Sequence, residues 1–194
     1  MSIRFGCCNP KRDKEKLKEK GLGKIFILMD IDGVLNTQVN ENFSNITSST
    51  VWKISNKNLN WIKETVCNPN IQFIWLSTWQ KESNEINKFL NIDDFPVSND
   101  YLTPPQTNSI TIKKLQINKL RSLYPLAKII SIDDDLNKKE VSSDLHIQPS
   151  FEKGLTDKDL RLLDKKIKKY IEKSKHYDYI KYLDFLKWKE DKFN

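Results

Sequence analysis

The chain has 194 residues, a formal net charge of +7 and a sequence pI of about 9.1. This length fits one α/β domain with a short accessory element. No apolar run approaches the roughly 20 residues needed to cross a bilayer, and the basic start lacks the hydrophobic segment of a secretory signal. We therefore expect a cytoplasmic protein without a transmembrane segment.

The cysteines predict no metal centre and no disulfide framework. Cys7 and Cys8 are adjacent and Cys67 stands alone, so neither a zinc spacing nor a paired bridge is indicated. Reduced thiols are the expected state.

Much of the excess positive charge lies in residues 11–24 and in the segment after Phe151. Such patches attract polyanions, nucleic acid above all, through steering and counterion release. A lysine-rich surface that is merely solvated has the same composition, and the sequence leaves both interpretations open.

The predicted elements begin with a polar, basic tail over residues 1–24. Ile25–Met29 is a continuous apolar run that ends in acidic residues, the pattern of a strand buried on both faces. Residues 37–58 are rich in Asn, Ser and Thr and predict a loop with little regular structure. A helix follows, with Leu59, Ile62 and Val66 at helical spacing, and ends at Asn68-Pro69.

Three further predicted strands alternate with two helices. The strands cover Ile71–Leu76, Lys128–Ile132 and a short segment, Leu145–Gln148. Between the first two, one helix is marked by Ile86, Phe89 and Leu90, and another, ending near Pro125, by Ile112, Leu115 and Leu120. This order predicts a core over residues 25–155 that is a doubly wound parallel α/β sheet.

Residues 156–194 form a predicted C-terminal helical segment. Thr156–Asp159 resembles a capping box, and an apolar stripe predicts a helix docked on the sheet, with lysines facing outward. The stripe is Leu160, Leu163, Ile167 and Ile171, and the lysines are Lys158, Lys165, Lys168 and Lys169. After a polar break at Ser174–His176, aromatic residues mixed with lysines fit either a single-strand binder or an ordinary packed or dimerising helix.

Polar side chains follow three of the predicted strands. Asp30 and Asp32 follow the first strand, Ser77-Thr78 the second and Asp133–Asp135 the third. The carboxyl ends of such strands form the site in a doubly wound sheet. Because clustered carboxylates repel one another, they predict a cation between them, and Mg²⁺ is the usual choice beside a phosphate.

These strand ends resemble the motifs of haloacid dehalogenase (HAD) phosphatases. The segment DIDGVLN, starting at Asp30, is similar to the first motif; the strand ending in Ser77 to the second; and the strand ending in Asp133-Asp134 to the fourth. The third motif is a single basic residue, for which Lys113 and Lys114 are candidates. A narrower resemblance is to the small capless domains of RNA-repair proteins and polynucleotide phosphatases, which share a later His…Gly-Leu-Thr, here His146 and Gly154–Thr156.

The resemblance implies a role for each of these residues. Asp30 would be the nucleophile and Asp32 the general acid and base, while Ser77 and Lys113, with Thr78 and Lys114 beside them, would bind the phosphoryl group. Mg²⁺ would be held by Asp30, by the main-chain carbonyl of Asp32 and by one carboxylate of the Asp133/Asp134 pair, with Asp134 favoured.

Many members of the family close a large cap over small metabolites, but the gaps from Asp32 to Ser77 and from Ser77 to Lys113 leave room for little or no cap, so we expect an open site. The implied activity is hydrolysis of a phosphomonoester, and an open site with a basic surround suits an RNA or DNA end or a nucleotide as the substrate. Two alternatives remain. One is a phosphoprotein phosphatase, although Val34 stands where those relatives typically carry Thr. The other is a non-catalytic binding module, against which the retention of both Asp30 and Asp32 argues.

Overall fold

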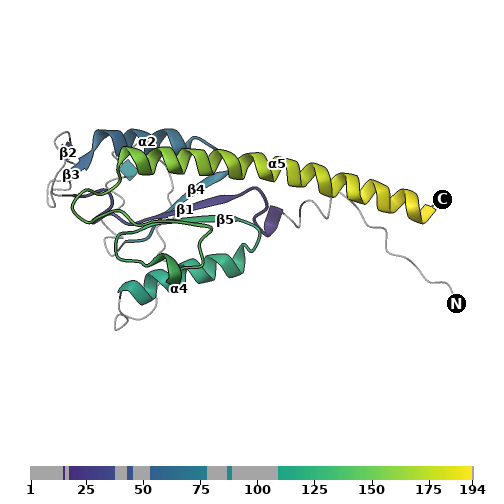
Figure 1. The fold of residues 1–194 in the computed structure, drawn as a ribbon, viewed down its shortest axis with the longest axis horizontal. Helices are drawn as coiled ribbons and strands as arrows, with labels where there is room; N and C mark the ends of the chain where they lie inside the picture. Colours follow the sequence, from purple (N-terminus) through teal and green to yellow (C-terminus); the bar gives the residue numbers. More distant parts are fainter. Residues whose placement is uncertain are drawn as a thin grey trace.

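A four-stranded parallel sheet with the order β4-β1-β5-β6 forms the centre of the protein (Figure 1). Its strands are β1 (Ile25–Met29), β4 (Ile71–Trp75), β5 (Lys128–Ile132) and β6 (Leu145–Ile147). The computed structural model describes residues 15, 18–37, 43–45, 53–77, 87–88 and 109–193, and for residues 43–45, 53, 109 and 176–193 it describes the backbone alone. The parallel sheet confirms the predicted fold class.

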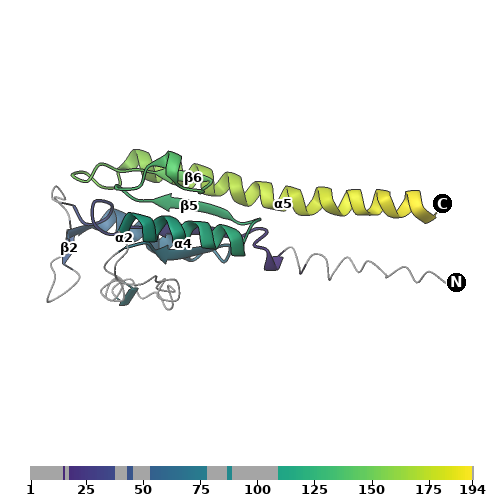
Figure 2. The same cartoon turned by 90° about the horizontal axis from the view of Figure 1, so that it is seen from below.

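The central strand β1 is apolar because both of its faces are covered. All five of its residues are buried, and they alternate between two hydrophobic clusters. Ile25, Ile27 and Met29 belong to the cluster under α2 (Asn56–Val66) and α5 (Asp157–Phe193), whereas Phe26 and Leu28 belong to the cluster under α4 (Ser109–Leu123). Figure 1 shows α2 and α5 above the sheet and α4 below it, and Figure 2, seen from below, shows α4 in front.

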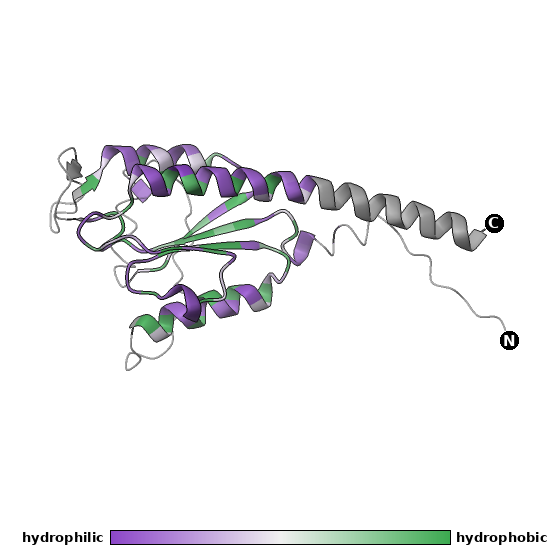
Figure 3. Ribbon diagram, in the orientation of Figure 1, coloured by the Kyte–Doolittle hydropathy of each residue, from purple (hydrophilic) through white to green (hydrophobic). Residues whose placement is uncertain are grey.

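Helix α5 covers the sheet with its first half and then continues past the end of the sheet (Figures 1 and 2). Leu160, Leu163 and Ile167 are buried in the core, and Tyr170 and Ile171 pack against it. Figure 3 shows the strands mostly in the hydrophobic colour and the first half of α5 in a mixture dominated by the hydrophilic one. This amphipathic packing agrees with the predicted C-terminal helical extension.

The polar break expected at residues 174–176 is absent, because α5 is continuous from Asp157 to Phe193. None of Ser174, Lys175 and His176 lacks a backbone donor as proline does. The Ser174 hydroxyl also donates to the Ile171 carbonyl at 2.8 Å within the helix. The side chains of the second half of α5 lie outside the described residues, so the expected aromatic and basic surface there stays a prediction.

The segment expected to be a loop contains a small antiparallel hairpin of β2 (Phe43–Asn45) and β3 (Lys53–Ser55). Strands of three residues carry too few side chains for an alternating pattern to be recognised. The buried Ile54 joins this hairpin to the turn after β1 through a bridge with Asn36. Helix α2 then begins at Asn56, where the Ser55 hydroxyl caps it by accepting from the Asn58 N–H.

Helix α4 has the predicted extent but a different buried face. Leu115 is 47% exposed, whereas Gln116, Ile117 and Leu120 are buried. The helix is thus rotated so that Lys113 also faces the interior. The predicted helix around Ile86–Leu90 lies mostly outside the described residues. Among the helices that the structure describes, none is long and apolar enough to span a membrane.

The docking of α5 can be tested with two neighbouring leucines. Leu163 is fully buried in the core and Leu162 is 37% exposed. Leu163→Ala is expected to lower the free energy of unfolding by about 2–5 kcal/mol, because it removes core contacts and leaves a cavity. Leu162→Ala, the matched control, is expected to change it by no more than about 0.5 kcal/mol. Urea denaturation of both variants gives the comparison, and equal losses would contradict this packing.

Candidate active site

Three strands end in register at the same edge of the sheet. Met29 pairs with Trp75 on one side and with Ile132 on the other, so the residues that follow these positions emerge together. The Asp30 N–H donates to the Ile132 carbonyl at 2.9 Å, and the Leu76 N–H donates to the Met29 carbonyl at 2.8 Å. The backbone ladder therefore brings Asp30, Ser77 and Asp133 to one place.

A buried ammonium group links two of the acids. Lys113, from α4, forms ion pairs with Asp30 and with Asp133, the second at 2.8 Å, and all three side chains are buried. Burial opposes the charge on Lys113, but the attraction of the two carboxylates outweighs it and raises the pKa of the ammonium. Lys113 is therefore cationic at neutral pH and offsets part of the negative charge of the site.

Asp30 is surrounded by groups that act on its carboxylate in opposite directions. Burial raises its pKa and the Asp133 charge adds to this, while Lys113 and a hydrogen bond from Ser77 lower it. Its Oδ1 accepts the Ile31 N–H at 2.6 Å. Burial outweighs the two lowering contacts, and the pKa of Asp30 is raised above its ordinary value.

The two acids after β5 have different surroundings. Asp133 is fully buried, and its Oδ1 accepts the backbone N–H groups of Asp135 and Leu136, both at 2.9 Å. Its Oδ2 faces Lys113. Asp134 is half-buried, and its carboxylate lies over Gly33, where an added Cβ would come within 2.3 Å of Asp134 Oδ2. Asp133 thus holds the loop and the lysine, and Asp134 is left to face the site.

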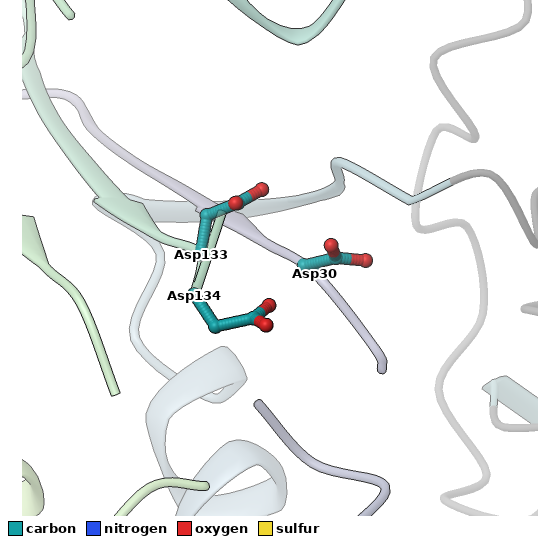
Figure 4. Close-up of side chains that lie close together, drawn as sticks. All are labelled: Asp30, Asp133 and Asp134. Carbon is teal, nitrogen blue, oxygen red and sulfur yellow. The ribbon is translucent and has the colours of Figure 1, made fainter. Parts of the chain in front are cut away.

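The carboxylates of Asp30, Asp133 and Asp134 fit a divalent cation (Figure 4). One oxygen from each lies within 4.8 Å of the others. Burial, together with the neighbouring charges of Asp135, Asp30 and Asp133, raises the pKa of Asp134 to about 6. Crowded carboxylate oxygens of this kind, with an uncompensated charge, are the ligands that hard cations such as Mg²⁺ prefer.

Asp32 is held by a residue to which the sequence analysis assigned no role. The Asn36 side-chain amide donates to Asp32 Oδ1 at 2.8 Å, and a backbone bridge also joins the two residues. The turn between them is closed at Gly33, whose φ of +68° favours glycine. The sequence does contain a signal for this contact: an Asn that stands four residues after an Asp in a tight turn can reach back with its amide to the carboxylate.

Lys114 and His146 have partners outside the three acids. Lys114 forms an ion pair with Glu140 at 2.8 Å, which leaves Lys113 as the lysine beside the acids. Thr78 lies outside the described residues. Buried His146 lies 2.8 Å from the Leu136 carbonyl through Nε2 and 2.8 Å from the Ser131 hydroxyl through Nδ1. Because a carbonyl only accepts, Nε2 carries the proton, and His146 anchors the loop that contains Asp133.

The geometry therefore joins a buried carboxylate, a buried ammonium, a hydroxyl and a candidate cation site at one sheet edge. Asp30 is the carboxylate common to all of these contacts. Such a set can bind the oxygens of a phosphoryl group and present a carboxylate to its phosphorus.

Comparisons with known proteins agree with this architecture. A family model described as the HAD domain in Swiss Army Knife RNA repair proteins matches residues 26–160. The HAD domain of the effector protein Lem4 from Legionella pneumophila is 13% identical, with a TM-score of 0.51, over 78% of this chain and 98% of that one. A probable YrbI family phosphatase from Pseudomonas syringae pv. phaseolica is 14% identical, with a TM-score of 0.41, over 86% of this chain and 98% of that one.

No curated protein matches the chain in sequence. At 13% identity the likeness to the Lem4 domain supports the fold alone. The family match covers well over half of the chain and includes all of the strand-end residues described above. The chain therefore belongs to the HAD-domain family found in Swiss Army Knife RNA repair proteins.

Proposed function

We propose that the protein is a Mg²⁺-dependent phosphomonoester hydrolase that forms an aspartyl-phosphate on Asp30. The observation that carries this proposal is the buried contact of Lys113 with Asp30 and Asp133, beside Ser77 and Asp134. An aspartate carboxylate attacks phosphorus in known covalent phosphoryl-transfer chemistry. The arrangement here combines that nucleophile with the positive charge that such a transfer needs.

In the first step a carboxylate oxygen of Asp30 forms a bond to phosphorus and the bond to the leaving oxygen breaks. Asp32, oriented by Asn36, donates a proton to that oxygen. In the second step Asp32 takes a proton from water, which attacks phosphorus and releases phosphate and the Asp30 carboxylate. Lys113 and Ser77 hold the transferring oxygens and offset their charge.

The cation would be held by the carboxylates of Asp30 and Asp134 and by the main-chain carbonyl of Asp32. Asp134 is preferred to Asp133 because it is the half-buried acid over Gly33, whereas Asp133 is fully buried and its Oδ1 accepts two backbone N–H groups of its own loop. Bound there, Mg²⁺ supplies positive charge that favours the ionised nucleophile and offsets the charge of the phosphoryl group.

The proposed substrate is a nucleic-acid end that carries a phosphate. Two observations support this choice over a phosphoprotein: the family is described from RNA repair proteins, and the chain carries a formal net charge of +7. Steady-state rates on phosphorylated oligonucleotides, mononucleotides and phosphopeptides test it directly. A preference for phosphopeptides would replace this substrate class while leaving the hydrolytic mechanism in place.

Asp30→Asn is expected to lower turnover of an aryl phosphate by roughly 10³-fold or more, because an amide keeps the shape of the side chain but cannot attack phosphorus. The measurement is the rate of release of the phenol, with and without Mg²⁺. Circular dichroism of the variant controls for folding. Turnover close to that of the unaltered protein would remove Asp30 from the role of nucleophile.

A pair of neighbouring variants tests the metal ligand. Asp134→Ala is expected to raise the Mg²⁺ concentration needed for half-maximal activity by about tenfold or more, because a carboxylate ligand is lost. Asp135→Ala, the control, removes an equal charge from an exposed side chain and is expected to leave that concentration within about twofold. If Asp135→Ala raised this Mg²⁺ concentration and Asp134→Ala did not, the metal ligand would be Asp135 in place of Asp134.

Gly33→Ala tests the contact between the turn and Asp134. The added Cβ would lie 2.3 Å from Asp134 Oδ2, so the carboxylate must move. We therefore expect the Mg²⁺ concentration needed for half-maximal activity to rise by about 10–100-fold. Gly23→Ala is the matched control, because its φ is +80° but the nearest neighbour of its Cβ among the described residues would be Ser174, at 3.9 Å. Both variants lose about 1–2 kcal/mol of backbone energy. Titration of activity with Mg²⁺ separates them, and equal dependence would contradict the contact.

A further inference from the structure

The outer face of α5 carries a row of exposed cations. We define the α5 ridge as the six basic residues on the side of the helix opposite the buried stripe. They are Lys158, Arg161, Lys165, Lys168, Lys169 and Lys173, and all six are exposed. Within the part of the chain that the structure describes, none of the six forms a salt bridge.

The acids of the same helical segment are occupied by other contacts. Asp157 pairs with Lys57 of α2, and Asp164 accepts the Trp61 indole N–H at 2.7 Å. Asp159 accepts the backbone N–H of Thr156 at 3.0 Å and its hydroxyl at 2.6 Å.

These contacts cap α5 and fasten it to α2. They also occupy three of the four acids between residues 157 and 175, with Glu172 as the fourth. Lys57, and to a lesser degree Arg161, lowers the pKa of Asp157, so Arg161 is the ridge cation nearest to a paired acid. The other cations of the outer face outnumber the acids that remain beside them. The ridge is therefore a surface with excess positive charge.

The ridge starts beside the candidate active site. The Leu155 N–H, just before α5, donates to the Val34 carbonyl at 2.9 Å, and Val34 lies in the same turn as Asp30 and Asp32. An added Cβ on Gly154 would come within 2.5 Å of that carbonyl, so the two segments are in close contact. From Lys158 to Lys173 the helix then leads away from the site over about 22 Å.

We propose that the α5 ridge binds the phosphodiester backbone of the nucleic acid whose phosphorylated end enters the site. This inference rests on the proposed function and adds the place where the body of the substrate lies. Aliphatic cations contact phosphates without reading bases, so the binding is independent of sequence. At about 3.4 Å per nucleotide along a strand, a ridge of about 22 Å covers six or seven nucleotides.

Binding is measured by fluorescence anisotropy of an unphosphorylated 12-nucleotide single strand with the full chain carrying Asp30→Asn. The test variant adds Lys165→Ala and Lys169→Ala. The control adds Lys138→Ala and Lys139→Ala instead. These two exposed lysines belong to η2 (Lys138–Glu140). The residues on either side of η2, Leu136 and Val141, pack in the hydrophobic cluster on the face of the sheet opposite α5.

The expected result is a smaller salt dependence for the test variant alone. Loss of two phosphate contacts reduces the slope of log affinity against log salt by about 1.4 for a single strand, and the control keeps the original slope. Equal slopes in the two variants would overturn the inference. So would tighter binding to anionic phospholipid vesicles than to the oligonucleotide, since that would assign the ridge to a membrane surface.

A second measurement separates this inference from the proposed function. With the unaltered nucleophile, kcat/KM on phosphorylated oligonucleotides is expected to rise with length and level off near seven nucleotides, relative to an aryl phosphate as reference. Hydrolysis with no dependence on length would contradict binding by the α5 ridge but not the proposed phosphatase activity. Failure to hydrolyse any phosphomonoester would contradict the phosphatase activity, and the anisotropy measurement would still test binding by the α5 ridge.

Discussion

The Lys113 ammonium, buried between Asp30 and Asp133, is the interaction on which the rest of the site depends. It joins α4 to the ends of two central strands. Without it two buried carboxylates would face each other with no cation from the protein, and breaking a buried pair of this kind costs about 3–5 kcal/mol. Burial raises the pKa of Asp30 and Lys113 lowers it, so the same contact that favours the ionised carboxylate also fixes the helix against the sheet.

The loop after β5 is organised around that ion pair. Asp133 accepts two backbone N–H groups of its own loop, and the neutral His146 ring holds the Leu136 carbonyl from β6. Burial lowers the pKa of His146, which keeps the ring uncharged at neutral pH. With the loop held at both points, Asp134 is left facing Asp30 across the turn at Gly33. The position of the candidate metal ligand thus follows from contacts made by its neighbours.

The sheet and its helices were predictable because their signals are local. Each buried strand is an apolar run that ends in polar residues, and the stripe of α5 repeats at helical spacing. The hairpin of β2 and β3 was not predictable, since strands of three residues have no pattern to read. The supposed break in α5 was wrong for a related reason: three polar residues interrupt an apolar stripe, but they do not interrupt backbone hydrogen bonding.

For the site, the order of the residues is enough to show that acids and a hydroxyl follow three parallel strands, and hence that Asp30, Ser77 and Asp133 converge. The choice between adjacent candidates depends on how the helix and the loop pack. Lys113 rather than Lys114 joins the acids because α4 is rotated to bury it. Asp133 is fully buried and contacts its own loop and Lys113, whereas Asp134 is half-buried over Gly33, because the turn after β5 directs successive carboxylates to different partners. Adjacent identical residues are equivalent in sequence, and only the packing of helix and loop gives each side chain its direction.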